Sequence, residues 1–292
     1  MENQYTIQKI DKKIKGDRLD INLSIDIEEA KTVIEDFIKT YVKNAGCNGV
    51  VIGLSGGVDS AVTTILCTEA LGNKNVKCLF LPDSTTPESD IRHKEILVKK
   101  FNLDCKTINI TPLVNEFLKY CIIKPDKYAL ANIKARIRMI LLFEYANMTK
   151  NLVCGTSNKS ELLVGYFTKY GDGGVDIIPI GDLYKTQVWE LAKKLNIPEE
   201  IISKPPTAGL WKDQYDEDEL KLSYDKLDKI LAGLEKKIDK KTIAKLANVK
   251  PFDVERIENM RIHSQHKRRN ALIPKIGIRT PGYDWRSSIQ SK

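Results

Sequence analysis

Residues 50–60 are Val50-Val51-Ile52-Gly53-Leu54-Ser55-Gly56-Gly57-Val58-Asp59-Ser60, and this stretch decides the fold. Its first half is a continuous apolar run, too short for a helix and suited to a strand buried on both faces. A glycine turn follows, and residues 61–71 are apolar enough for a buried helix. A strand, a glycine turn and a helix bring backbone N–H groups to a helix N-terminus. The stretch therefore predicts an anion site that needs no side-chain cation.

The segments on either side continue the alternation of strand and helix patterns. Further strands are predicted at residues 76–81, 105–110, 151–155 and 175–180, and helices at 26–45, 87–101, 126–148 and 183–195. This order predicts an α/β fold with a doubly wound parallel sheet, helices on both faces and ligands at the carboxyl ends of the strands. Helical patterns at 224–238, 241–247 and 251–262 predict a helical C-terminal portion.

Length and composition predict one soluble domain. The chain has 292 residues, 42% of them hydrophobic and 29% charged. We expect an N-terminal arm at 1–25, a domain at 26–267 and a basic tail at 268–292. No apolar run approaches the roughly 20 residues of a membrane span, and the N-terminus lacks a secretory pattern. We therefore expect a cytoplasmic protein with no membrane partner.

The cysteines and the net charge exclude few classes of function. The six cysteines include no C-x-x-C pair, so we interpret them as reduced core residues rather than zinc ligands. The net charge of +8 is compatible with nucleic acid, acidic small molecules or simple solubility. The densest basic run, His266 to Arg269, has no interleaved aromatic residues for base stacking. We expect no nucleic-acid partner.

The glycine turn is open to several interpretations. Residues 53–57 also satisfy the G-x-S-x-G pattern of serine hydrolases, but only three histidines are available as a base. A simple turn capped by Asp59 or Ser60 would need only one such residue. A Walker A loop would require a lysine that is absent. Asp59 beside an anion site is typical of Mg²⁺ bridging to polyphosphate, which calls for a second carboxylate elsewhere.

The loop from Ser55 to Ser60 resembles the pyrophosphate loop of the N-type ATP pyrophosphatases, which cleave ATP to AMP and pyrophosphate and activate a substrate as an adenylate. Residues 155–176, Gly-Thr-Ser-Asn-Lys-Ser-Glu-Leu-Leu-Val-Gly-Tyr-Phe-Thr-Lys-Tyr-Gly-Asp-Gly-Gly-Val-Asp, resemble the NAD synthetases more specifically. The resemblance continues through Pro179, Lys185 and Thr207 and covers about residues 30–267. It implies a Rossmann-like fold of the adenine-nucleotide α-hydrolase type.

The resemblance also implies roles for the matching residues. The implied ATP-binding residues are Gly53, Leu54, Ser55, Gly56, Gly57, Val58, Asp59, Ser60, Thr156, Lys185 and Thr207. The implied deamido-NAD-binding residues are Arg136, Lys169, Asp176, His266 and Lys267. Asp59 and Glu161 would hold Mg²⁺, while Asp172 and Lys185 would be catalytic. Asp172 would take the proton of ammonium.

The residue pattern supports several of these roles independently. Arg136 and Arg138 fall at the edges of the apolar stripe of the 126–148 helix, where a guanidinium can grip a carboxylate or phosphate. Lys169, Asp172 and Asp176 lie among four glycines. A loop this rich in glycine is too flexible to serve core packing, so its charged residues indicate a functional role.

The implied reaction is the ATP-dependent amidation of deamido-NAD by ammonia, a ligase reaction that yields NAD, AMP and pyrophosphate through an acyl-adenylate. We expect free ammonia as the donor, because the 54 residues before Ser55 are too few for a glutaminase domain. The family resemblance implies a homodimer. Residues 204–219 are expected to close over the intermediate as a lid that excludes water.

Some features depart from the family pattern or leave alternatives open. Residues 81–87 do not match, and Gly209 stands where better-known members carry aspartate. A tRNA-modifying ATP pyrophosphatase would use the positive charge but would want paired or reactive cysteines. A non-catalytic nucleotide sensor would not need Glu161 or the loop at 169–176.

Overall fold

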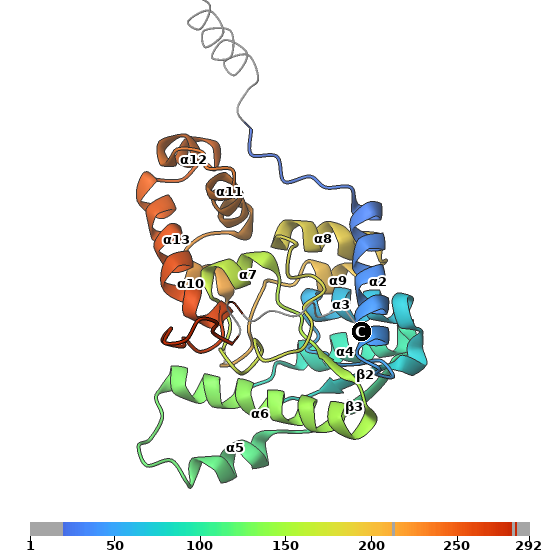
Figure 1. Cartoon of the computed structure of the whole chain (residues 1–292). Coiled ribbons are helices and arrows are strands. Elements are labelled where there is room, and N and C mark those ends of the chain that lie inside the picture. The colour runs from blue at the N-terminus through green and yellow to red at the C-terminus, as the bar shows by residue number, and fades with distance from the viewer. Residues whose placement is uncertain (1–19, 212–213, 282–283, 285–292) are drawn as a thin grey trace, which may run out of the picture.

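The computed structural model describes residues 20–211, 214–281 and 284. Its centre is a sheet of parallel strands in the order β3-β2-β1-β4 (Figure 1). The strands are β1 (Val50–Gly53), β2 (Val76–Phe80), β3 (Asp104–Thr107) and β4 (Leu152–Cys154). The predicted α/β class with a parallel sheet is confirmed.

Helices cover both faces of this sheet. One face carries α5 (Thr111–Leu118) and α6 (Lys127–Thr149), and the other carries α2 (Ile27–Asn44), α3 (Val58–Leu71), α4 (Glu88–Phe101), α8 (Lys185–Lys194) and α9 (Glu199–Ile202). Side chains alternate along each strand: Val51 packs with the α6 cluster, while Val50 and Ile52 pack with the α3 cluster. Since both faces are buried, β1 needs apolar residues throughout, which explains its unbroken run.

A second hydrophobic cluster holds the C-terminal portion together. It is built from α7 (Lys159–Val164), α10 (Asp216–Leu220), α11 (Tyr224–Glu235), α12 (Lys240–Leu246) and α13 (Pro251–His263), which Figure 1 shows grouped beside the sheet. The predicted helices of this portion are confirmed. A 3₁₀ turn at Ser264–Arg268 follows, and Arg268 donates to the carbonyls of Leu162 and Leu163.

The described end of the predicted arm packs against the domain. Ile21 is 3% exposed and belongs to the C-terminal cluster, and the carbonyl of Leu23 accepts from Gln187 Nε2 at 2.7 Å. Asp26 caps α2, accepting from the N–H groups of Glu28 and Glu29. Residues 1–19 of the arm lie outside the described residues, as do 282–283 and 285–292 of the tail.

The predicted strand at 175–180 is wrong. This segment forms a single bridge between Cys154 and Ile177. Pro179 has no N–H to donate to a ladder. The carboxylate of Asp176 accepts from Val153 N at 2.7 Å. This N–H of β4 is therefore not available to a carbonyl of a fifth strand.

All six cysteines are free thiols, with Cys67, Cys78 and Cys154 buried and the other three partly exposed. The interpretation as reduced residues agrees with this finding, although only half of them are fully in the core. No helix within the described ranges is long and apolar enough to cross a bilayer.

Candidate active site

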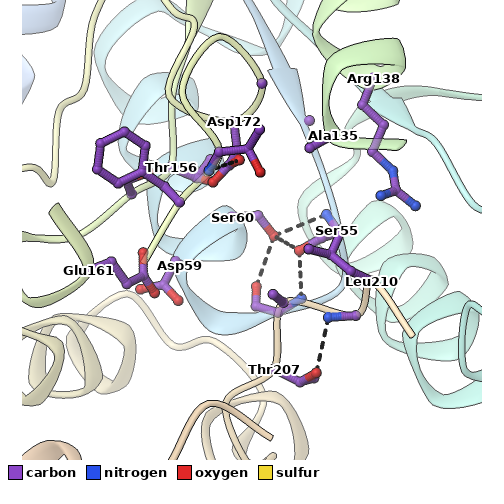
Figure 2. Close-up of a pocket in the computed structure, with 18 of the residues that line it drawn as sticks. Ser55, Asp59, Ser60, Ala135, Arg138, Thr156, Glu161, Asp172, Thr207 and Leu210 are labelled. Carbon is purple, nitrogen blue, oxygen red and sulfur yellow. Dashed lines mark hydrogen bonds between the residues drawn. The ribbon is translucent and has the colours of Figure 1, made fainter. Parts of the chain in front are cut away.

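The segments that follow β1 and β4 meet at the carboxyl ends of the strands. Strand β1 has β2 on one side and β4 on the other, so the strand order reverses here, the position where open α/β sheets bind ligands. A cavity of about 500 Å³ opens at this point. Most of the predicted site residues line it: Gly53, Leu54, Ser55, Gly57, Val58, Asp59, Ser60, Thr156, Glu161, Asp172, Lys185, Thr207 and Lys267. Figure 2 labels Ser55, Asp59, Ser60, Thr156, Glu161, Asp172 and Thr207 among them.

The glycine turn is held by its own hydroxyl groups. Ser60 Oγ accepts from Ser55 N at 3.1 Å and donates to the carbonyl of Gly57 at 2.9 Å, and Figure 2 shows its contact with Ser55 Oγ. Gly56 has a φ of +83°, in the region that favours glycine. Because no side chain caps α3 at Gly57, the N–H groups of its first turn can bind an anion.

The same hydrogen bonds argue against a serine hydrolase. Ser55 Oγ is in contact with Ser60 Oγ and accepts from Gly57 N at 3.3 Å. Among the hydrogen bonds of the described residues, none joins Ser55 to a histidine. The base that a nucleophilic serine needs is not in place.

Two carboxylates share one buried ammonium at the floor of the pocket. Lys185, only 2% exposed, forms an ion pair with Asp59, and its Nζ lies 3.9 Å from Glu161 Oε1. Asn158 Nδ2 donates to Asp59 Oδ1 at 3.1 Å, and the Asn158 side chain also caps α7 at Glu161 N. The second carboxylate expected from the sequence therefore comes from the first turn of α7, the helix that follows β4.

Burial and charge set the protonation of this group. Burial, reinforced by repulsion from Asp59, raises the pKa of Glu161 well above its usual range. Burial alone would lower the pKa of Lys185, but attraction to Asp59 and Glu161 outweighs it and the pKa is raised. Two oxygen donors of this kind could hold Mg²⁺, which takes one or two carboxylates and completes its shell with phosphate and water. Among the described residues no third His, Cys, Asp or Glu joins them in a metal-binding group.

Asp172 faces the pocket from the glycine-rich loop. Its Oδ1 accepts from Thr168 N at 2.8 Å, which fixes the carboxylate. Desolvation by the surrounding protein raises the pKa of Asp172, and the nearby Lys267 opposes this effect. Lys267 Nζ donates to the carbonyls of Gly165 and Phe167, at 2.7 and 2.9 Å. Asp172 therefore suits a proton acceptor better than an ordinary surface aspartate does.

The remaining predicted dinucleotide residues lie outside the lining of this pocket. Arg136 donates to the carbonyl of Lys169 at 3.3 Å, and Lys169 Nζ donates to the carbonyl of His266 at 2.7 Å. The fold thus brings these three residues together although they are far apart in sequence. Asp176 stands apart from them at the edge of β4. Their roles stay predictions.

Sequence reasoning missed an acidic group beside the pocket. Asp83 is buried, and its Oδ2 lies 3.1 Å from both Lys134 Nζ and Arg138 Nη2. Although burial works in the opposite direction, hydrogen bonds from Thr85 and the charge of Arg138 lower the pKa of Asp83. Arg138 lines the pocket, and its position at the edge of the helix stripe was the available signal.

Part of the predicted lid also lines the pocket. The carboxylate of Asp216 accepts from Ala208 N at 3.0 Å and from the Tyr224 hydroxyl at 3.2 Å, while Thr207 Oγ1 accepts from Gly209 N at 3.0 Å. Residues 212–213 of this segment lie outside the described residues. Closure of the segment stays a prediction.

The fold and the site together define a class: an α/β protein whose glycine turn presents main-chain amides at a helix start and whose acidic pair shares a buried lysine. The NAD synthase family model matches residues 30–271. The chain belongs to the NAD synthase family.

Individual relatives agree with this assignment. The NH(3)-dependent NAD(+) synthetase of Methanococcoides burtonii is 49% identical over 212 residues, which is 71% of this chain and 80% of the relative. The NH3-dependent NAD synthetase of Campylobacter jejuni superimposes with a TM-score of 0.73 at 34% identity, over 86% of this chain and 100% of that one. The NMN synthetase of Francisella tularensis superimposes with a TM-score of 0.77 at 33% identity, over 87% and 100%.

Proposed function

We propose that this chain makes NAD from deamido-NAD, ATP and ammonia through an acyl-adenylate and releases AMP and pyrophosphate. The observation that carries the proposal is the single pocket that joins a main-chain phosphate loop, the Asp59–Lys185–Glu161 group and Asp172. Membership of the NAD synthase family supports the same reaction.

In the first step, a nicotinate carboxylate oxygen attacks the α-phosphorus of ATP, and the bond to the β-phosphate oxygen breaks. The amides of the Ser55–Ser60 loop and the ammonium of Lys185 bind the polyphosphate and stabilise the charge on departing pyrophosphate. Thr156 and Thr207 contact ATP from the other loops of the pocket. Mg²⁺, held by Asp59 and Glu161, would add charge neutralisation at the phosphates.

In the second step, the nitrogen of ammonia attacks the acyl carbon, and the bond to AMP breaks. Asp172 accepts the proton that the nitrogen must lose. Its raised pKa makes it a stronger base than a free aspartate, while the Thr168 N–H keeps the carboxylate aimed. Lys267 lies near this carboxylate and holds two carbonyls of the same loop.

The dinucleotide would extend from the pocket toward Arg136, Lys169 and His266. Asp176, at the edge of β4, would bind a more distant part of it. We further propose a homodimer whose interface covers α5 and α6, because that side of the molecule exposes large apolar residues. They are Phe117, Tyr120, Ile122, Ile123, Tyr128 and Ile140. We place this reaction in the cytoplasm, and light scattering of the purified protein tests the dimer.

The test is an assay of purified protein with ATP, Mg²⁺, ammonium and deamido-NAD. We expect NAD, AMP and pyrophosphate in equal amounts. A parallel reaction with the corresponding mononucleotide tests the alternative suggested by the Francisella structure. Turnover of the mononucleotide alone would contradict the choice of dinucleotide, and the absence of AMP from every reaction would overturn the proposal.

A further inference from the structure

Asp228 is a buried carboxylate that lies behind the active-site pocket. It sits on α11, is 0% exposed and is not among the residues that line the cavity. Its Oδ1 accepts from the hydroxyl of Ser160, and its Oδ2 accepts from Thr186 N and Thr186 Oγ1, both at 2.9 Å. Three donors from two other helices therefore converge on one side chain.

These donors belong to the helix starts that carry the pocket's charged residues. Ser160 precedes Glu161 in the first turn of α7, and Thr186 follows Lys185 in the first turn of α8. Ser160 Oγ also accepts from Lys185 N at 3.0 Å. The first N–H groups of a helix have no partner within the helix, so Asp228 and Ser160 together cap α8 from outside. A negative charge at this end of α8 is also favourable to the helix dipole.

The same face of α11 supports the side chain of Lys185. Tyr224 lies four residues before Asp228 and therefore on the same side of the helix. Its ring centroid is 5.3 Å from Lys185 Nζ, and its hydroxyl donates to Asp216. Helix α11 thus holds the start of α8 through Asp228 and reaches the ammonium through Tyr224.

A buried carboxylate is a costly way to join three helices. Burial raises the pKa of Asp228 to about 6, and the hydrogen bonds from Ser160 and Thr186 limit this rise. Apolar side chains could join helices without this cost. A carboxylate also fixes the relative positions of the groups that it joins, because each hydrogen-bond donor must lie along an oxygen lone pair.

We propose that Asp228 is a positioning residue that sets the places of Lys185 and Glu161 at the nucleotide. The inference rests on the roles proposed above for those two residues. Asp228 touches neither the pocket nor the reacting atoms and acts through the first turns of α7 and α8. A small displacement of catalytic groups costs a large factor in rate, so the effect of losing Asp228 falls on turnover.

The test compares Asp228→Leu, Asp228→Asn and Ser160→Ala with the control Asp225→Asn. Asp225 lies on the same helix and has a side chain 61% exposed, and within the part of the chain that the structure describes it forms an ion pair only with Lys229. We measure kcat, the KM for ATP, unfolding by urea, and binding of a non-hydrolysable ATP analogue. We expect Asp228→Leu to lower kcat at least about tenfold with a smaller change in KM, and Asp228→Asn to retain an intermediate kcat. Asp225→Asn should match the wild type.

A double-mutant cycle with Lys185→Met separates positioning from general stability. If Asp228 acts through Lys185, Asp228→Leu lowers kcat much less in the Lys185→Met background than in the wild type. Equal factors in both backgrounds, or a folded Asp228→Leu with wild-type kcat, would overturn the inference. If Asp228→Leu does not fold, Asp228→Asn and Ser160→Ala go through the same cycle.

The binding measurement keeps this inference apart from the reaction proposed above. If the wild type makes no NAD, the proposed function fails. The double-mutant cycle between Asp228 and Lys185 is then measured with the dissociation constant of the ATP analogue. If the effects of the two substitutions on the binding free energy simply add, Asp228 does not position Lys185.

Discussion

Replacing Gly56 with alanine tests the geometry of the phosphate loop directly. Gly56 has a φ of +83°, and a Cβ built on it would lie 2.6 Å from the backbone carbonyl oxygen of Asp90 and 3.1 Å from its Cα. These are backbone atoms at the start of α4, so they cannot move aside as the end of a flexible side chain could. Gly56→Ala must therefore shift the loop, the helix or both.

The magnitude follows from two contributions. A left-handed φ costs an L-residue about 1–2 kcal/mol, and overpacking against a rigid neighbour adds about 1–3 kcal/mol. Gly46 offers a matched control, because its φ is +66° and a Cβ there would meet nothing within 4 Å. Gly46→Ala should show only the first contribution, whereas Gly56→Ala should lose about 2–5 kcal/mol of unfolding free energy.

The assay combines urea unfolding with steady-state kinetics. Because the proposed reaction places the loop amides against the polyphosphate, we expect Gly56→Ala to lower kcat/KM for ATP about 10- to 100-fold. Gly46→Ala should keep the wild-type value. If Gly56→Ala is no less stable than Gly46→Ala and turns over ATP normally, the reasoning about this loop is refuted.

Three further predictions concern carboxylates. Asp59→Asn should abolish Mg²⁺-dependent turnover and leave the circular dichroism spectrum unchanged, and full activity would remove the metal assignment. Asp172→Asn should lower kcat/KM for ammonia more than kcat/KM for ATP. Because the pKa of Asp172 is raised, activity of the wild type should fall with acid above the usual aspartate range, and the variant should lack this fall. Identical pH profiles of the two proteins would exclude the role of Asp172 as a base. Asp228 has a folded pKa of about 6 against 3.8 in the unfolded chain, so its contribution to stability is present below pH 4 and is lost as the pH rises through 6. Relative to Asp228→Asn, the wild type should lose about 2 kcal/mol of unfolding free energy between pH 4 and pH 7, and parallel pH curves would contradict this.

Local patterns predicted most of the fold but not all of it. The apolar run of β1 and the helical patterns of α6 and α11 depend on neighbours a few residues away, so periodicity reveals them. The segment at 175–180 has the composition of a strand but forms only one bridge to β4, because the Asp176 carboxylate already binds Val153 N. Composition cannot show whether a partner edge is free.

The candidate site divides in the same way. Ser55 to Ser60 were identified from their order alone, since a strand, a glycine turn and a helix start bring their amides together locally. The resemblance to the NAD synthetases supplied Glu161 and Lys185 but could not show how they meet. No pattern pointed to Asp228, and the only signal for Asp83 was the position of Arg138 on its helix, because both carboxylates act through residues that are distant in sequence.

The amino-acid sequence by itself determined the strand–turn–helix unit, the main-chain amides that gather at its turn and the alternation that makes the sheet parallel. Only the tertiary structure decided that Asp59, Glu161 and Lys185 share one buried charge group and that Asp228 supports two of them from behind. The reason is physical: hydrophobic periodicity reports which face of an element is buried, whereas the partners of a buried charge depend on strand order and on how distant helices pack.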